Sequence, residues 1–289
     1  MSARRILVAG AGGAVGFEIV RALRARNCAV VATYRTARDG LDDRLHCLGA
    51  KPAQWDLADL ERGRDLLGAV DSAVFTPILT VAEGAAALAP EKQLVFFSSN
   101  NIAIDPGAPV YAALNAAEIR VRETSASATI LRPTMIYGYP GDGNLSVLLR
   151  AIQRSPVTPR IGNGRALQQP IFFRDVASIV AEIVVADKTT AQTVATAGPS
   201  PMSQDALYRA VCAAAGGKSA IVPAPAWLAS AAARLADVIG LRFPLSPAQI
   251  ARADLDKIPV NDGVILGETL LAEGLAQLAA ALDDTSAGA

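Results

Sequence analysis

The sequence predicts an α/β fold: a doubly wound parallel sheet, followed by a smaller and mostly helical lobe. Three observations support this prediction. Short apolar runs alternate with amphipathic stretches through the first half of the chain, and a glycine-rich turn directly follows the first run. After Ser203 the chain consists largely of alanine-rich stretches broken by Pro and Gly. Because parallel strands need crossover connections, the alternation indicates helices that link the strands of one sheet.

The strands expected in the first half are short apolar runs that suit burial on both faces of a sheet. They cover residues 5–9, 29–33, 73–75, 93–97 and 129–131. Helices are expected over residues 14–26, 57–69 and 110–124. In the first of these helices Val15, Ile19 and Leu23 share one face, which is the spacing of an amphipathic helix that packs on a sheet.

After Arg132 the alternation of short apolar runs and amphipathic stretches becomes less regular. A loop is expected over 138–144, a helix over 145–154, a strand over 169–173, a helix over 175–187 and a strand over 193–196. The apolar stretch 221–241 contains two prolines, an arginine and an aspartate, so we interpret it as a buried or amphipathic helix and not as a membrane span. We therefore expect residues 1–135 and about 170–200 to form the sheet domain, and about 136–169 and 201–289 to form the second lobe.

Composition excludes several classes of function. The 27 basic and 27 acidic residues give a net charge of zero, so the chain has no excess of cations for nucleic acid or an anionic membrane surface. The 3 cysteines are scattered, which favours a reducing compartment. The single histidine, His46, is expected in a loop and excludes a His-rich metal site; we predict no metal. Since no targeting segment is recognisable, the sequence predicts a cytoplasmic protein.

A glycine motif lies between the first predicted strand and the first predicted helix. Gly10, Gly13 and Gly16 have the spacing GxxGxxG. The first glycine permits a tight turn, the second lets a pyrophosphate approach the backbone, and the third allows the helix to pack closely on the strand. The N-terminus of the helix supplies unpaired N–H groups for phosphates. At this position in a βαβ unit, the motif predicts a Rossmann dinucleotide-binding domain.

The end of the second strand indicates which dinucleotide is bound. An NAD site places an acidic residue about 20 residues after the first glycine, but residues 19–38 contain no acid. Arg35 stands there instead, with Arg38 close behind. A guanidinium pairs well with a 2′-phosphate, so NADP is favoured over NAD. The alternative is a solvated surface arginine, in a chain that has 22 Arg and 5 Lys.

Asp56 follows a third strand that we expect between the runs 29–33 and 73–75, and it has two equally good interpretations. Its carboxylate can accept a hydrogen bond from the adenine amine, or it can be a helix N-cap ahead of Leu60.

Several further motifs recur in the order of one known family. They are Trp55-Asp-Leu57, Phe97-Ser-Ser99, Tyr111 four residues before a polar residue, Leu131-Arg-Pro-Thr-Met-Ile-Tyr-Gly138 and Gln169-Pro-Ile-Phe-Phe-Arg-Asp-Val176. With the glycine motif, they cover roughly residues 5 to 180. The chain resembles the extended or atypical short-chain dehydrogenase/reductases, which are often called NAD-dependent epimerase/dehydratases. The resemblance implies a Rossmann domain with a small C-terminal substrate lobe.

The resemblance also implies roles for individual residues. Tyr111 matches the tyrosine that gives or takes a proton, and Ser99 (or Ser98) matches the hydroxyl that orients the substrate oxygen. Asn115 stands where the family has a lysine that activates the tyrosine, which is a clear departure. Further cofactor contacts are implied at the remaining motif positions: Gly12, Ala14, Val15, Leu57, Thr76 and Pro133.

The departure at Asn115 leaves three explanations open. The protein reduces a substrate that needs little help with its proton, or it uses another acid, or it binds NADP without turnover. No lysine occurs between Lys92 and Lys188, so Arg120, Arg132 and Arg174 are the candidate cations considered in its place.

Three other polar residues have both a functional and a structural interpretation. Arg174 either binds an anionic substrate group or forms a structural ion pair, and Asp175 is expected to cap the following helix. Asp142 and Asn144 either line the rim of a pocket or belong to a solvent loop.

We therefore predict an NAD(P)-dependent oxidoreductase that transfers hydride to or from a small carbonyl or alcohol substrate. One alternative is a non-catalytic NADP-binding sensor or accessory protein. A second is a nucleotide-sugar epimerase or dehydratase, which the short loop between Ser99 and Tyr111 disfavours. The expected partner is a small molecule and neither nucleic acid nor a membrane, and the sequence leaves homo-oligomerisation open.

Overall fold

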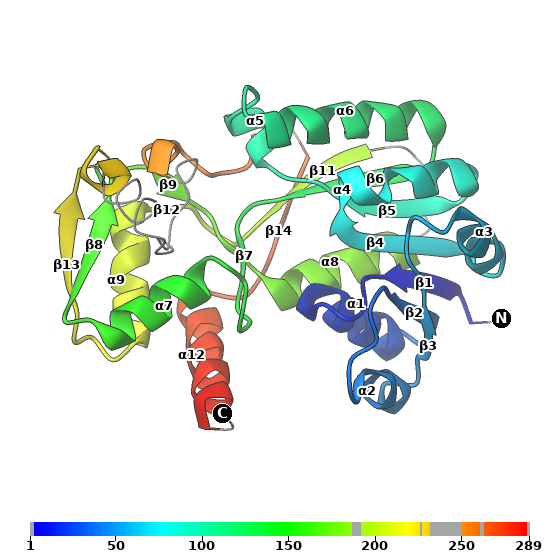
Figure 1. The fold of residues 1–289 in the computed structure, drawn as a ribbon, viewed down its shortest axis with the longest axis horizontal. Coiled ribbons are helices and arrows are strands. Elements are labelled where there is room, and N and C mark those ends of the chain that lie inside the picture. The colour runs from blue at the N-terminus through cyan, green and yellow to red at the C-terminus, as the bar shows by residue number, and fades with distance from the viewer. Residues whose placement is uncertain (1–2, 187–191, 226, 232–249, 261–262, 288–289) are drawn as a thin grey trace. The chain divides into compact units, whose positions relative to one another are not determined.

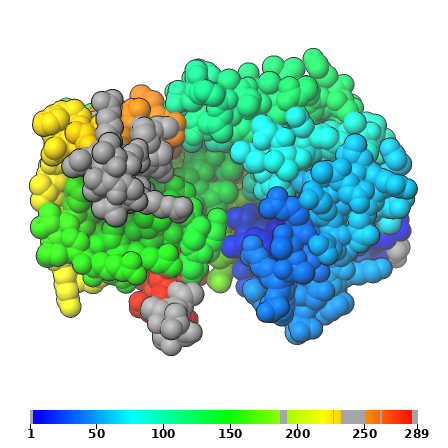
Figure 2. All heavy atoms as spheres, viewed as in Figure 1, coloured from blue at the N-terminus to red at the C-terminus, as the bar shows by residue number. Residues whose placement is uncertain are grey.

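The computed structural model describes residues 3–186, 192–225, 227–231, 250–260 and 263–287, which are the coloured parts of Figures 1 and 2. The chain divides into two compact units. Unit 1 contains Met1–Pro133, Phe173–Thr196 and Pro259–Gly267; unit 2 contains Thr134–Phe172, Ala197–Ile258 and Glu268–Ala289. One segment departs from the sequence-based boundaries, because Pro259–Gly267 belongs to unit 1 and was expected in the second lobe.

Unit 1 is built on a sheet of eight strands in the order β14-β11-β6-β5-β4-β1-β2-β3. The strands are β1 (Arg5–Ala9), β2 (Ala29–Tyr34), β3 (Lys51–Gln54), β4 (Ser72–Ile78), β5 (Gln93–Phe97), β6 (Ala128–Pro133), β11 (Gln192–Ala197) and β14 (Val264–Leu266). All pairings from β3 across to β11 are parallel. This confirms the predicted α/β class with a doubly wound parallel sheet. β14 explains why Pro259–Gly267 joins unit 1, since it forms an edge of this sheet.

The helices of unit 1 connect these strands (Figure 1). They are α1 (Ala14–Ala25), α2 (Leu41–Cys47), α3 (Leu60–Gly68), α4 (Leu79–Ala82), the 3₁₀ turn η1 (Glu83–Leu88), α5 (Asn101–Ile104), α6 (Pro109–Thr124) and α8 (Phe173–Val185). Helices α1 and α8 pack together, and Arg26 Nη2 of the α1 C-terminus lies 3.2 Å from Glu182 Oε1 of α8. Between the sheet and α6, Phe75 stacks on Phe96 with ring centroids 4.9 Å apart. This core holds the carboxyl ends of the central strands in place.

Three expected elements differ in detail. The strand expected over 169–173 is two short strands, β9 (Leu167–Gln168) and β10 (Ile171–Phe172), because Pro170 between them has no N–H for a ladder. Helix α8 already begins at Phe173, so Asp175 lies in its first turn and is not the capping residue. His46 belongs to α2 and not to a loop.

Unit 2 combines helices with short two-stranded sheets (Figure 1). Besides β9 and β10 it contains β7 (Ile136–Tyr137), α7 (Leu145–Arg154), β8 (Val157–Ile161), β12 (Met202–Ser203), α9 (Gln204–Ala214), β13 (Ala220–Ala224) and α12 (Leu271–Ala287). The helix expected over 221–241 is wrong at its start, because β13 pairs there with β8 in parallel; residues 232–241 lie outside the described residues. Among the helices that the structure describes, none is long and apolar enough to cross a membrane.

Candidate active site

Two glycines of the loop between β1 and α1 have no room for a side chain. Gly10 has a φ of +84°, and a Cβ there would overlap Thr76 Oγ1. A Cβ on Gly16 would overlap the Gly10 carbonyl oxygen, so this glycine lets α1 start directly against the loop. Both positions therefore require glycine to build the turn itself.

Gly13 differs from these two, because its side-chain position is open. Its backbone is extended, with a φ of −89°, and it precedes the first residue of α1. The nearest atom to a Cβ would be the Gly10 carbonyl oxygen at 3.5 Å. The N–H groups of the next residues, Ala14, Val15 and Gly16, have no acceptor one turn back in the helix, and the first turn of α1 contains no acid. The loop is thus an open cradle of donors that fits the pyrophosphate of a dinucleotide.

Two arginines follow β2 beside this loop. Arg35 comes directly after the strand and is exposed. Arg38 Nη1 donates a hydrogen bond to the Gly12 carbonyl oxygen at 3.2 Å, which fixes a guanidinium against the glycine loop. The sequence pattern had singled out Arg35, and the structure adds the contact of Arg38 with the loop.

The structure removes one of the two interpretations of Asp56. Helix α3 is capped by Asp59, whose Oδ1 accepts a hydrogen bond from Arg62 N at 3.0 Å. Asp56 is exposed and accepts a hydrogen bond from Ala58 N at 3.0 Å, so the expectation that it caps the helix is wrong. Leu57, which follows it, is half-buried. One carboxylate oxygen of Asp56 therefore orders the loop after β3.

Thr76 and Pro133 lie near the carboxyl ends of β4 and β6, two parallel strands that are separated by β5. Thr76, near the end of β4, donates a hydrogen bond from Oγ1 to the Ala9 carbonyl oxygen at 2.9 Å. Pro133 is the last residue of β6, and its carbonyl oxygen accepts a hydrogen bond from Asn100 N at 3.2 Å. The carboxyl ends of the strands in an open α/β sheet form the edge at which ligands bind.

Tyr111 is buried on the first turns of α6, and its hydroxyl oxygen accepts a hydrogen bond from Asn101 Nδ2 at 2.9 Å. Sequence reasoning missed Asn101; the only available signal was its place two residues after Ser99. Asn115, one helical turn after Tyr111, is exposed on α6. The tyrosine is therefore oriented by an amide from α5.

The two serines after β5 have different environments. Ser98 Oγ donates a hydrogen bond to Glu118 Oε1 at 2.6 Å, and this carboxylate is fully buried. Ser99 Oγ accepts a hydrogen bond from Asn101 N at 3.2 Å, and Ser99 is half-buried. Ser98 is therefore part of the framework of the site, and Ser99 presents its hydroxyl beside Asn101.

Glu118 is the centre of an ion-pair network that the sequence analysis did not foresee. Arg132 Nε and Nη2 donate to its two oxygens at 2.9 and 2.7 Å, and Arg122 Nη2 also donates to Oε2. The pairing joins α6 to β6. The other two candidate arginines, Arg120 and Arg174, also have carboxylate partners. Arg120 pairs with Glu83 at 2.8 Å. Arg174 lies 3.8 Å from Glu18, which supports its structural interpretation.

Comparisons with known proteins bear on the fold. No family model matches the chain. L-xylulose reductase from Cavia porcellus is 43% identical over 74 residues, and the enzyme of the same name from Mus musculus is 44% identical over 71 residues. These matches cover 25% and 24% of this chain, and only 30% and 29% of the two relatives. The chain thus matches less than a third of the length of these curated relatives.

Solved structures match over nearly the whole chain. Triphenylmethane reductase from Citrobacter, solved with NADP(H), has a TM-score of 0.73 and 19% identity, covering 95% of this chain and 99% of that one. A nucleoside-diphosphate-sugar epimerase from Pseudomonas aeruginosa has a TM-score of 0.71 and 17% identity, covering 98% and 99%. The chain has the fold of the extended short-chain dehydrogenase/reductases. The resemblance expected from the sequence is thus confirmed at the level of the fold.

Glu118 is expected to be a large contributor to stability. Glu118→Gln keeps the shape of the side chain but removes the negative charge that pairs with the guanidinium of Arg132, which is 13% exposed. Loss of one partner of a buried ion pair costs about 3 kcal/mol or more. Urea unfolding measures this change. The matched control is Glu83→Gln, whose partner Arg120 is 56% exposed, and there the cost is expected to stay below about 1 kcal/mol. Equal losses of unfolding free energy in the two variants would contradict the large contribution assigned to Glu118.

The loop 138–144 is largely exposed, as expected of a solvent loop, but it is organised by a buried aspartate. Asp142 is 9% exposed, and its carboxylate accepts hydrogen bonds from the N–H groups of Gly138, Asn144 and Ser146 at 3.2, 2.8 and 3.0 Å. Asp142 therefore organises this loop from inside unit 2. Asn144 is exposed and lines a cavity of that unit.

The cysteines are not among the residues of the candidate site described above. Cys28 and Cys212 are buried free thiols and Cys47 is an exposed one. Among the described residues, no group of His, Cys, Asp and Glu has the arrangement of a metal site.

Proposed function

We propose that the protein is an NADP-preferring oxidoreductase that transfers hydride to or from a small carbonyl or alcohol substrate. The observation that carries the proposal is the open cradle at Gly13, in the same unit as a buried tyrosine whose hydroxyl is oriented by Asn101. The partial relatives are reductases by name, and so is one of the matched structures.

Different residues of unit 1 would bind different parts of the dinucleotide. The glycine loop and the first N–H groups of α1 would hold the pyrophosphate. Arg35 and Arg38 would pair with the 2′-phosphate, and Asp56 would accept a hydrogen bond from the adenine amine. Thr76 and Pro133 would border the cofactor at the ends of β4 and β6. When bound, the nicotinamide supplies or accepts the hydride.

Tyr111 would move the proton that accompanies the hydride. In reduction its hydroxyl gives a proton to the substrate oxygen, and its own oxygen becomes negative. The Asn101 N–H group already donates to that oxygen at 2.9 Å and would stabilise the developing charge. Ser99 would orient the substrate oxygen, and Asn115 would bind a ribose hydroxyl without supplying charge.

Cofactor consumption tests this function against its alternatives. The loss of NADPH absorbance is followed with a panel of aldehydes and ketones, and NADP binding is measured by calorimetry. Turnover supports the oxidoreductase, whereas tight binding with no turnover of any panel member favours the sensor. Turnover of a nucleotide sugar without net cofactor consumption would favour the epimerase, with which the fold is compatible. A protein that binds no dinucleotide would refute all three.

Arg35→Ala is expected to reduce the preference for NADP over NAD. A charge-assisted hydrogen bond to a phosphate contributes about 1.5–3 kcal/mol, or about 10- to 150-fold in affinity. Calorimetric titration of both dinucleotides measures the ratio, and Arg38→Ala, tested in parallel, divides the effect between the two arginines. The matched control is Arg64→Ala, an exposed arginine on α3 that is expected to leave the ratio unchanged. Equal affinities for NADP and NAD in the unmutated protein would refute the preference.

A further inference from the structure

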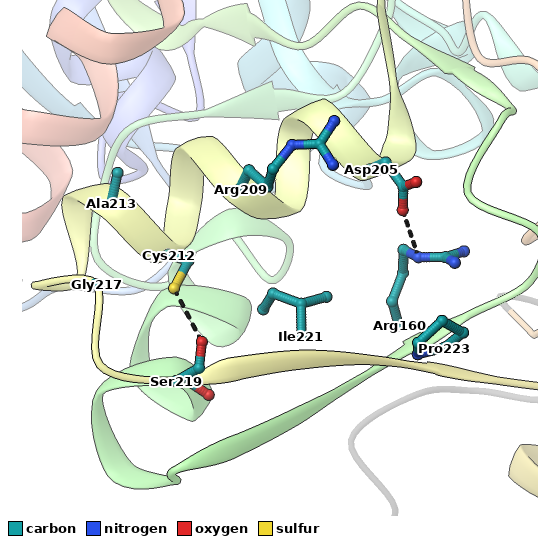
Figure 3. A pocket seen from close by; sticks show the side chains of 9 residues that line it. All are labelled: Arg160, Asp205, Arg209, Cys212, Ala213, Gly217, Ser219, Ile221 and Pro223. Carbon is teal, nitrogen blue, oxygen red and sulfur yellow. Dashed lines mark hydrogen bonds and ion pairs between the residues drawn. The ribbon is translucent and has the colours of Figure 1, made fainter.

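Unit 2 contains two hollows with different chemistry. The first is an open hollow of 540 Å³ between α9 and β13 (Figure 3). Two pairs of its polar groups contact each other: Arg160 Nε lies 2.6 Å from Asp205 Oδ1, and Cys212 Sγ donates to the Ser219 carbonyl oxygen at 3.2 Å. Arg209, the other cation of the lining, is exposed. Because these paired groups already have partners, they give no evidence for a bound ligand, and we draw no inference from this hollow.

The second hollow is a smaller cavity of 270 Å³ enclosed by α7, β8, α9 and the segment 250–257. Its apolar lining residues are Met135, Leu145, Val147, Leu148, Ala151, Pro159, Ile161, Leu207, Ile250 and Ala253. On α9, Gln204 is followed by Leu207 and Tyr208 at i+3 and i+4, so the three side chains share the face that lines the cavity. Ligand pockets usually measure about 300 to 1,000 Å³, and this cavity lies just below that range, so only a small molecule fits.

Two buried glutamines in this lining have unpaired amide atoms. Gln168 is 2% exposed and Gln204 is 8% exposed, yet Gln168 Nε2 and Gln204 Oε1 have no hydrogen-bond partner among the residues that the structure describes. A buried polar atom without a partner costs about 1–3 kcal/mol, and native proteins rarely leave two in one place. The adjacent Gln169, by contrast, donates from Nε2 to the Gly198 carbonyl oxygen at 2.7 Å. The residues that line the cavity therefore include one buried donor and one buried acceptor that no described residue uses.

The charge of the lining limits what can enter. Among the described lining residues Lys257 is the one cation, and none is acidic. Burial lowers the pKa of Lys257, and the positive charge of Arg252 lowers it further. A diphosphate would bring more negative charge than this single ammonium balances, so the lining favours an uncharged ligand.

We propose that this cavity binds a small, uncharged and mainly apolar molecule with a carboxamide-like edge. The carbonyl oxygen of the ligand accepts from Gln168 Nε2, and its N–H or O–H group donates to Gln204 Oε1. The claim that this ligand is the substrate of the enzyme rests on the proposed function. The claim that the cavity binds it does not.

Cinnamamide is the probe, with methyl cinnamate and UDP for comparison, titrated calorimetrically into the full chain without dinucleotide. Cinnamamide has both an acceptor and a donor, whereas methyl cinnamate lacks the donor. We expect cinnamamide to bind about threefold to tenfold more tightly than methyl cinnamate, and UDP not to bind. Gln168→Leu and Gln204→Leu are each expected to weaken cinnamamide by a similar factor. The matched control is Gln153→Leu, an exposed residue of α7 outside the lining, which leaves the affinity unchanged.

Thermal unfolding separates recognition from a structural role. Replacing an unpaired buried amide with leucine is expected to leave the Tm unchanged or to raise it, while affinity falls. A lowered Tm with unchanged affinity would overturn the proposal, as would absence of cinnamamide binding or tighter binding of UDP. Cinnamamide binding in a protein that binds no dinucleotide would refute the proposed function alone. Dinucleotide-dependent turnover with no binding in this cavity would refute the cavity proposal alone.

Discussion

Gly13→Val is expected to abolish dinucleotide binding and to leave a folded protein. A side chain at this position meets only the Gly10 carbonyl oxygen, 3.5 Å from the Cβ, so the free protein accommodates it. Its backbone is extended, a conformation that valine adopts readily. The same side chain fills the cradle in which the pyrophosphate would lie against the first turn of α1. Calorimetry with NADP measures the loss, and thermal unfolding checks the fold.

Two further glycine variants make this result specific. Gly68→Val lies at the exposed end of α3, where a Cβ meets no atom within 4 Å, and it is expected to leave NADP affinity unchanged. Gly16→Val forces a Cβ onto the Gly10 carbonyl oxygen and is expected to destabilise the fold itself. If Gly13→Val retained NADP affinity, the dinucleotide would have to bind elsewhere.

Tyr111→Phe is expected to lower turnover by about 10²- to 10⁴-fold while NADP affinity stays the same. The substitution keeps the ring in the core and removes the hydroxyl that exchanges a proton with the substrate, and general acid–base catalysis contributes a factor of this size. Steady-state kinetics with a substrate identified from the carbonyl panel measures the loss. Asn101→Ala, which removes the amide that donates to the Tyr111 oxygen, is expected to cause a smaller loss. If Tyr111→Phe left turnover untouched, Tyr111 would have no catalytic role, although the cofactor site would stand.

Asn115→Lys tests the effect of restoring the lysine that the family has one helical turn after the tyrosine. A lysine one helical turn after Tyr111 adds a cation that favours tyrosinate, so alcohol oxidation is expected to reach its maximal rate at lower pH. Asn115 is exposed, which leaves room for the longer side chain. The pH–rate profile measures the shift. The matched control is Ala113→Lys, another exposed position of α6, which is expected to leave the profile unchanged. An unchanged profile in Asn115→Lys would mean that the site is built around the asparagine.

The sequence by itself determined the features that depend on neighbouring residues. Apolar runs such as 5–9 and 93–97 coincide with β1 and β5, because strands buried on both faces need continuous apolar side chains. The glycine motif predicted the turn before α1, since positive φ at Gly10 and contact at Gly16 are local requirements. The alternation of these strands with helices then predicted the parallel sheet.

Only the tertiary structure decided which polar groups meet across long separations. Glu118 and Arg132 pair between α6 and β6, and Gln168 and Gln204 line one cavity from two different elements. No periodicity encodes such contacts, because they depend on how separate elements pack and on which buried donors and acceptors are left without partners. The same applies to β14, whose residues return to the sheet of unit 1 after a long excursion through unit 2. A short edge strand has little signal of its own, and its place is fixed by the unpaired edge of β11 that it covers.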